Sequence, residues 1–468
     1  MKAVRYVGKK GCAAEEYSAA IASGYCVVDT LPRTPNVTVR FDIDDKPLGV
    51  NIGPHARDFL DLAVAVYIAD ECEERAKAKD FWSRSFDFLF PVREPKSWTP
   101  ATGLLQKALH TLSGDHFDFT WLERTAIAAM GSHRRTLPHG YDTVCLFSGG
   151  IDSLLGAYQL LKAGKKVFLV GHQADGTTAS AQTELARALG QMFPKHVRLV
   201  QTRVARSHGS IQRFSLPAKL EDTHRPRSFL FLGLAITIAN AAKINEVVIP
   251  ENGLIAINPP LQKSRLGTLS TRTTHPLYLS QLLEFVREAG IYQGTIKNPF
   301  MYQSKTDMLL GVDSALHPLL VRSVSCAHAG EVRWEGKAGH RHCGRCVPCI
   351  YRRAAMIRAG LDGQEKYVDD VFVKLSGMTK YRQSDFRALV AFAQRVVAAS
   401  PAKRDAMVLS HGAFSPDLGG LLGPFPTHDF SPWSDMLLRW SEDFMAIVDT
   451  LSTSATRAII GVRQHERR

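Results

Sequence analysis

The chain has 468 residues, of which 45% are hydrophobic and 22% are charged. A chain of this kind buries a large core and divides into two or three domains of about 100 to 200 residues each, which excludes an intrinsically disordered protein. Its apolar stretches fall short of the roughly 20 residues needed to cross a bilayer, and the first thirty residues lack a signal peptide's apolar segment. We therefore expect a cytoplasmic protein with no membrane partner.

The formal net charge of +13 favours an anionic partner, because a positive field raises the rate of encounter with nucleotides and nucleic acids. The basic residues are spread along the chain without an RNA-binding signature. RNA binding is therefore the less favoured interpretation, and a solvated basic surface is the more favoured one.

The hydrophobic pattern divides the chain into an N-terminal α+β accessory domain, a nucleotide-binding α/β core and a helical C-terminal region. Their expected limits are residues 1–141, 142–359 and 360–468. In the first region, short β-branched and aromatic runs at 25–30, 36–41 and 86–90 flank a helical stretch at about 56–76. No catalytic motif occurs in this region.

The core region changes to a pattern of strand, Gly-rich turn, helix and strand, which predicts a Rossmann-like parallel sheet with helices on both faces. The C-terminal region has the pattern of helices, with a Gly/Pro-rich loop at 412–432. Ser431 and Pro432 are expected to be the N-cap and first-turn residues of a helix that runs to about Thr450.

A glycine-rich turn follows the first core strand, the apolar run at 143–147. Two adjacent glycines let consecutive N–H groups face one anion, and a helix expected from Leu154 favours a phosphate at its positive end. The hydroxyls of Ser148 and Ser153 add donors, and Asp152 is expected to cap the helix or to help hold Mg²⁺. The predicted catalytic residues are Ser148, Asp152 and Ser153, within an ATP site of Ser148, Gly149, Gly150, Ile151, Asp152, Ser153 and His172.

His172 belongs to this set because it follows the second core strand, at 166–170. Ligands of open α/β sheets bind beyond the carboxyl ends of the strands, so His172 is a candidate to border the adenine or the substrate. A purely structural histidine is the alternative.

The run from Ser148 to Ser153, SGGIDS, resembles the SGGxDS phosphate loop of the ATP pyrophosphatase superfamily. Members of that superfamily cleave ATP to AMP and pyrophosphate. The resemblance implies nucleotide binding, and a turn that only connects two elements is the alternative.

Four of the eight cysteines have the spacing C-x16-C-x2-C-x2-C, and they are Cys326, Cys343, Cys346 and Cys349. Short C-x2-C links let two thiolates reach one ion at about 2.3 Å, and four thiolates complete a tetrahedral zinc shell. Such a shell leaves no open position, so the expected zinc is structural. An iron-sulfur cluster is the alternative occupant. His340 and His342 are expected to be exposed loop residues.

The cysteines lie within a longer pattern, SC…CGxCxxCxxR, formed by Ser325, Cys326, Cys343, Gly344, Cys346, Cys349 and Arg352. This pattern resembles the signature of the QueC family of 7-cyano-7-deazaguanine synthases, with extra residues between the first two cysteines. The resemblance covers roughly residues 142–358. QueC enzymes generally lack both flanking regions, so the architecture is more similar to the long QueC-like proteins of bacterial anti-phage systems, the QatC type.

QueC enzymes also have an Arg-Asn pair that opens a helix and a Gly-containing acidic loop after the next strand. Here the helix at 227–242 opens with Arg227-Ser228, so serine replaces the asparagine, and Pro250 stands where a glycine is usual. Because these positions would contact the base, the identity of the bound base stays open. An ordinary helix start and turn are the alternative. The candidate substrate residues are Arg227, Glu251 and Asn252, with Arg272 and Lys305 from the runs at 271–276 and 305–307.

The resemblance implies that 7-carboxy-7-deazaguanine reacts with ATP and Mg²⁺ to give an acyl-adenylate and pyrophosphate. In QueC enzymes ammonia then gives the amide, and a second adenylation gives the nitrile. An acyl-adenylate also accepts other amines, so attachment of the deazaguanine to a protein amine by a defence homologue is the alternative, and the nucleophile stays open. Protein partners from the same defence system are also expected.

Two other functions remain open from the sequence. One is tRNA base modification, which often needs a free reactive cysteine and is disfavoured because the clustered cysteines serve the metal. The other is a nucleotide-sensing subunit without turnover, against which the intact SGGIDS loop argues.

Overall fold

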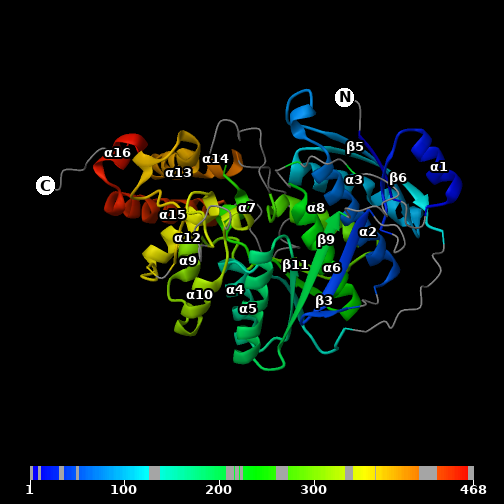
Figure 1. Ribbon diagram of the computed structural model, residues 1–468, viewed down its shortest axis with the longest axis horizontal. Helices are drawn as coiled ribbons and strands as arrows, with labels where there is room; N and C mark the ends of the chain where they lie inside the picture. The colour runs from blue at the N-terminus through cyan, green and yellow to red at the C-terminus, as the bar shows by residue number, and fades with distance from the viewer. Residues whose placement is uncertain are drawn as a thin grey trace.

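The computed structural model describes residues 4–8, 12–30, 36–48, 52–125, 137–206, 216, 221, 225–259, 272–332, 341–363, 365–410 and 430–461. Its strands form a sheet of four strands and a sheet of seven, and helices surround both sheets (Figure 1). Among these residues, no helix is both long enough and apolar enough to cross a membrane.

The seven-stranded sheet forms the α/β core. In spatial order its strands are β11 (Thr295–Lys297), β10 (Glu246–Val248), β7 (Thr143–Leu146), β8 (Val167–His172), β9 (Val197–Arg206), β3 (Val37–Ile43) and β4 (Lys46–Pro47). The first five strands pair in parallel, whereas β3 pairs antiparallel with both β9 and β4. The predicted Rossmann-like parallel sheet is confirmed.

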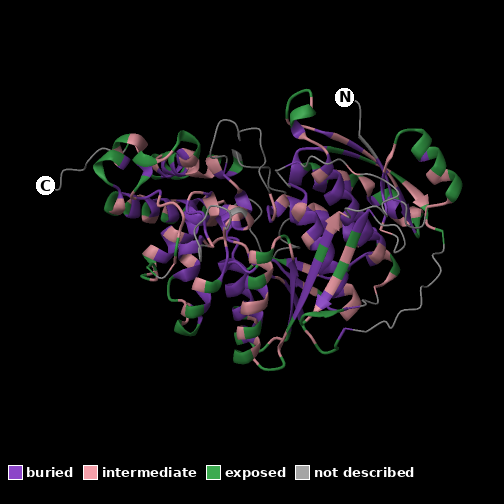
Figure 2. Cartoon of the chain, in the orientation of Figure 1, coloured by how far each residue is buried: buried purple, intermediate pink, exposed green. Residues whose placement is uncertain are grey.

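Helices cover both faces of this sheet because successive strand residues point to opposite sides. Val144 and Phe168 pack in one buried cluster with residues of the helices α2 (Pro54–Cys72), α6 (Arg227–Ala242) and α8 (Pro276–Glu288). Cys145 and Leu169 pack in another with residues of α4 (Ile151–Lys162) and α5 (Gly176–Met192). Figure 2 shows buried residues on the helix faces that meet the sheet, whereas the strand β3 also carries intermediate and exposed residues.

The four-stranded sheet belongs to the N-terminal region. Its order is β2 (Cys26–Val28), β1 (Val4–Gly8), β5 (Ser85–Val92) and β6 (His116–Glu123), with α1 (Ala14–Ala22) and α3 (Pro95–Ser113) in the connections. All three pairings are parallel. Two of the three strand runs expected in this region, at 25–30 and 86–90, therefore lie in this sheet.

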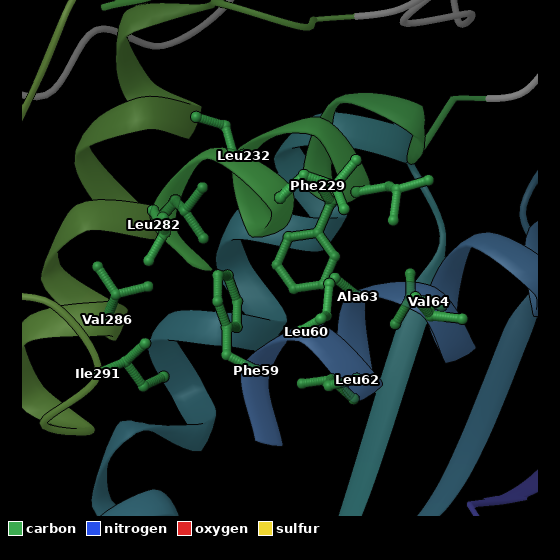
Figure 3. Close-up of a cluster of buried hydrophobic side chains, with 14 of the residues drawn as sticks. Phe59, Leu60, Leu62, Ala63, Val64, Phe229, Leu232, Leu282, Val286 and Ile291 are labelled. Atoms are coloured by element: carbon green, nitrogen blue, oxygen red, sulfur yellow. The ribbon is translucent and has the colours of Figure 1, made fainter. Parts of the chain in front are cut away.

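The third run is β3, which lies in the core sheet, where its pairing with β9 extends from Val37 opposite Arg206 to Ile43 opposite Val200. Helix α2 also packs on the core, because Phe59 meets Phe229 of α6 edge to face at 5.4 Å between ring centroids. Figure 3 shows this cluster of α2, α6 and α8 side chains. The N-terminal region thus contributes a strand and a helix to the core, and the domain limit at 141 stays a prediction.

The C-terminal region is helical, as expected. Its helices are α13 (Lys380–Ala398), α14 (Pro401–Ser410), α15 (Ser431–Leu451) and α16 (Ser454–Ile460), and they pack with α12 (Val347–Arg358) at one end of the molecule (Figure 1). The predicted N-cap at Ser431 is wrong, because Phe430 is the N-cap and Ser431 is already helical. Residues 412–429 of the expected loop at 412–432 lie outside the described residues.

Candidate functional site

The turn of Ser148, Gly149 and Gly150 joins β7 to α4. Gly149 has φ +82°, and a Cβ there would lie 3.2 Å from the backbone nitrogen of Gln182, so glycine is required. The carbonyl of Gly150 accepts from Leu154 N at 3.0 Å. Helix α4 therefore begins at Ile151, three residues before the expected start at Leu154, and its positive end lies directly at the glycine turn.

The hydroxyls of Ser148 and Ser153 are engaged within the loop. Ser148 Oγ donates to Ser153 Oγ at 3.2 Å, and Ser153 Oγ donates to the Gly150 carbonyl at 3.0 Å. Gly150 N donates back to Ser148 Oγ at 3.3 Å. In this state the two hydroxyls brace the turn.

Asp152 extends from the first turn of α4 to the segments that follow β10 and β11. Its Oδ2 accepts from Asn252 N at 3.2 Å and from Asn252 Nδ2 at 2.6 Å, and its Oδ1 forms an ion pair with Lys305. All three side chains are buried. Lys305 begins the helix α9 (Lys305–Leu309), where a cation opposes the helix dipole, so Asp152 supplies the compensating charge.

Glu251 lies beside this ion pair, and its Oε2 accepts from Thr273 Oγ1 at 3.2 Å. Burial and then the charge of Asp152 raise the pKa of Glu251 to about 7, while Lys305 and Thr273 oppose the shift. The carboxyl of Glu251 therefore exchanges a proton near neutral pH. Three of the five candidate substrate residues, Glu251, Asn252 and Lys305, thus lie together with Asp152.

The other candidates are His172 at the end of β8, Arg227 at the start of α6, and Arg272 in the segment before α8. The ring of His172 packs against Tyr67 and Phe231, at 6.0 and 5.6 Å between centroids. Burial and then the charge of Arg227 lower the pKa of His172 to about 4, so the imidazole is neutral at pH 7. Burial lowers the pKa of Arg272, which precedes Thr273, to about 10. Roles for these three residues in ligand binding stay predictions.

Gln182 of α5 is a neighbour of the loop that the sequence did not single out. Its Nε2 donates to the His172 carbonyl at 3.2 Å and to the Ser148 carbonyl at 3.5 Å. A Cβ at Gly171 would lie 2.5 Å from Gln182 Oε1, so the end of β8 must be glycine for this side chain to fit. A glutamine inside a helix carries no sequence signal for such a role.

The four clustered cysteines come together as predicted. The Sγ atoms of Cys326, Cys343, Cys346 and Cys349 lie within 4.8 Å of one another, and the last three residues are buried. The Cys343 and Cys349 sulfurs are 3.9 Å apart, close to the edge of about 3.8 Å of a tetrahedron with 2.3 Å metal–sulfur bonds. The donor set therefore fits a four-thiolate metal ion.

Backbone geometry supports the same fit. Cys343 N donates to Cys326 Sγ at 3.3 Å, and Cys346 N donates to Cys343 Sγ at 3.4 Å, as suits thiolate acceptors. Gly344 has φ +79°, and a Cβ there would lie 2.0 Å from the Asp369 carbonyl, so only glycine fits between the two cysteines.

The segment that leads into the cysteine cluster also contacts the glycine turn, because Val324 N donates to the Gly149 carbonyl at 2.8 Å. The expectation that His342 is an exposed loop residue is wrong. Its side chain is buried, and its Nε2 accepts from Ser325 N at 3.5 Å. His340 lies outside the described residues.

The loop and the Asp152 cluster meet beyond the carboxyl ends of β7 and β10, where open α/β sheets bind their ligands. Helical N–H groups and a lysine suit an anion such as a phosphate. A carboxyl with a pKa of about 7 suits proton transfer. The arrangement is therefore equipped for chemistry on a bound phosphate ester or anhydride.

Comparisons with known proteins find similarity over about half of the chain. This chain is 23% identical to a 7-cyano-7-deazaguanine synthase of Methanothrix thermoacetophila over 235 residues. The alignment covers 48% of this chain and 97% of that protein. The chain is 22% identical to a 7-cyano-7-deazaguanine synthase of Acinetobacter baylyi over 240 residues. That alignment covers 48% of this chain and 94% of the relative. No family model and no solved structure matches the chain.

Proposed function

We propose that this protein is a QueC-like ATP-dependent ligase that adenylates a 7-deazaguanine carboxylate. The observation that carries the proposal is the contact of Asp152, from the SGGIDS loop, with Asn252 and Lys305. These residues join the loop to the two segments in which substrate contacts are expected. Similarity to nearly the whole length of two 7-cyano-7-deazaguanine synthases supports the choice of substrate class.

In the first step, a carboxylate oxygen of 7-carboxy-7-deazaguanine attacks the α-phosphorus of ATP. The bond from that phosphorus to the β-phosphate oxygen breaks, and pyrophosphate leaves. The N–H groups at the start of α4 hold the phosphates, and Lys305, the cation paired with Asp152, stabilises the charge that develops. Mg²⁺ would enter with ATP to neutralise phosphate charge, with Asp152 as its protein ligand.

In the second step, an amine nitrogen attacks the acyl carbon and AMP leaves. The proton lost by the amine passes to Glu251, whose pKa of about 7 lets it accept a proton at neutral pH. With ammonia the product is the amide, and a second adenylation at the amide oxygen followed by loss of AMP and a proton gives the nitrile. With a protein amine the product is a conjugate, the outcome proposed for an anti-phage role.

The cysteine cluster and the C-terminal helices would stabilise the segments that form the Asp152 cluster. The four cysteines would hold a structural zinc ion. A Cβ at Gly253 would lie 2.4 Å from Met436 Sδ of α15, next to Asn252. Arg439 of α15 also forms an ion pair with Asp307 of α9 at 3.4 Å. The C-terminal helices therefore brace both segments that hold Asp152.

The test is to incubate the purified protein with ATP, Mg²⁺ and 7-carboxy-7-deazaguanine, with and without ammonium, and to follow pyrophosphate and the base by mass spectrometry. Asp152→Asn should lower pyrophosphate release by about 10² to 10³, the cost of removing one electrostatic element of a catalytic site. Asp313→Asn is the matched control, because Asp313 binds Tyr158 and Lys162 further along the same helix.

Each outcome of this experiment has a separate meaning. Conversion of the base to amide or nitrile supports the synthase reaction. Pyrophosphate release that requires an added protein or tRNA, with the free base unchanged, identifies a different acceptor. Nucleotide binding without any pyrophosphate release contradicts an enzyme and favours the sensor.

A further inference from the structure

The segment that leads into the first metal-ligating cysteine packs on the phosphate loop. Besides the bond from Val324 N to the Gly149 carbonyl, a Cβ placed on Gly150 would lie 3.3 Å from the Val324 carbonyl and 3.4 Å from Ser325 Oγ. Ser325 Oγ also accepts from Ile151 N, the first N–H of α4, at 3.5 Å. Ser325, which is 174 positions from Ile151 in the chain, therefore lies at the N-terminal end of α4, where an anion would bind.

The Ser325 hydroxyl has a proton to donate at this place. Its oxygen accepts from Arg352 Nη1 at 3.1 Å and, more weakly, from Ile151 N. Because these two N–H groups occupy the lone pairs of the Ser325 oxygen, the O–H proton points away from them. Within the described part of the chain no acceptor takes that proton, and Ser325 is only partly buried, so it is accessible to a ligand.

The neighbouring serines differ in this respect. Ser148 and Ser153 donate to acceptors inside the loop, as described above. Ser323 also accepts from Arg352 Nη1, at 2.9 Å, but it donates its own proton to the Leu320 carbonyl at 2.6 Å and is fully buried. Of these four hydroxyls, the one at Ser325 is free to bind an anion.

Arg352 fixes and polarises this hydroxyl. The guanidinium is fully buried, its Nε donates to the Glu365 carboxylate at 2.9 Å, and its Nη2 donates to the Leu320 carbonyl at 2.5 Å. It stands on α12, which also carries the metal-ligating Cys349. A buried cation that donates to a hydroxyl oxygen makes its O–H a stronger donor toward an anion.

We propose that Ser325 is a nucleotide-binding residue, whose hydroxyl donates to an anionic phosphate oxygen held at the start of α4. Arg352 acts as its positioning residue, and the metal-bound segment delivers both groups to the loop. The inference rests on the proposed ATP-dependent function. A bound phosphate oxygen replaces Ser325 Oγ as the acceptor of Ile151 N, a contact that at 3.5 Å is at the limit of a hydrogen bond.

The experiment measures binding of α,β-methylene-ATP with Mg²⁺ by calorimetry, together with the metal content of each variant. Ser325→Ala should weaken binding by about tenfold to hundredfold, the cost of one hydrogen bond to a charged group, at unchanged metal content. Ser323→Ala, which removes the other hydroxyl on Arg352, should leave affinity within about twofold.

Unchanged nucleotide affinity in Ser325→Ala overturns the inference. So does a loss of affinity in Ser323→Ala as large as that in Ser325→Ala, because that result assigns the effect to packing around Arg352. If Ser325→Ala loses the metal, Ser325→Thr and Ser325→Val decide, because they have the same shape and only threonine has a hydroxyl. Equal affinities in that pair also overturn it. A wild-type protein that fails to bind the nucleotide contradicts the proposed function instead.

Discussion

The carboxyl of Glu251 lies where its surroundings oppose its charge. Burial and the nearby charge of Asp152 raise its pKa to about 7, although Lys305 and the Thr273 hydroxyl act in the opposite direction. Below pH 7 the carboxyl is therefore mostly protonated and cannot accept a proton. Above pH 7 it is ionised and can act as a base.

At a constant concentration of free ammonia, acyl transfer should therefore increase with pH, reach half of its maximum near pH 7 and level off above it. Glu251→Gln should lower the rate by about 10² to 10⁴ and remove this dependence. Glu246→Gln is the control, because Glu246 lies at the start of β10, where hydrogen bonds from Lys165, Lys297 and Thr143 outweigh burial and lower its pKa to about 2. Initial rates between pH 5.5 and 8.5 give the comparison. An acidic limb that survives in Glu251→Gln shows that another group titrates.

At this scale the sequence predicted the residues that lie close to a strand end. The SGGIDS loop, Glu251 and Asn252 each directly follow a strand of a parallel sheet, and such ends meet at one edge. The partners of the hydroxyls of Ser148 and Ser153, and the burial of His342, depend instead on side-chain packing between distant segments. Local sequence carries no information on those contacts.

Among the secondary-structure elements, α2 and α6 cross at close range. A Cβ at Gly233 of α6 would lie 2.8 Å from the Cβ of Ala63 in α2, a distance that side chains do not reach without a backbone shift. The close approach lets Phe59 reach Phe229, at 5.4 Å between ring centroids (Figure 3). The Phe59 ring also lies 6.0 Å from that of Phe285. Glycine is therefore a packing requirement at this crossing.

Gly233→Ala should destabilise the protein by about 1 to 3 kcal/mol, because it forces two packed helices apart. Gly103→Ala is the matched control, since Gly103 is exposed in α3 and a Cβ there has no neighbour within 4 Å. That change should be neutral or stabilising by up to about 1 kcal/mol, because alanine loses less backbone entropy in a helix than glycine. Urea unfolding of both variants provides the test. Equal stabilities would show that the crossing relaxes without cost.

The sequence predicted most element positions from periodicity and turn residues, and the differences have local causes. Helix α4 begins at Ile151 because the Gly150 carbonyl already accepts a helical hydrogen bond. Helix α15 has Phe430 as its N-cap, and no side-chain hydrogen bond caps the helix there. The N-cap predicted from the Ser431-Pro432 pair is therefore one residue too late in the chain. The run at 36–41 was correctly expected to be a strand, but its partner β9 is more than 150 residues away, and pairing partners leave no local pattern.

Across the whole molecule, the N-terminal region and the α/β core share one hydrophobic cluster. Residues of β1, α2, β5 and α3 belong to the same buried cluster as residues of β7, β8, β9, α6 and α8. Tyr67 of α2 also contacts the candidate site residue His172. The expected division at residue 141 would therefore cut through this cluster.

A fragment of residues 142–468 should fail to fold on its own. Without β3 the edge of β9 is unpaired, and without α2 the apolar face of α6 around Phe229 meets solvent, which favours aggregation. The fragment should give no cooperative thermal transition in near-ultraviolet circular dichroism, whereas residues 1–461 should melt as one unit. Residues 1–125 supplied as a separate chain should restore a soluble complex, because they carry the missing strand and helix. A cooperative transition from the fragment alone would instead support the boundary expected from sequence, and would mean that β9 and α6 tolerate exposure in the smaller unit.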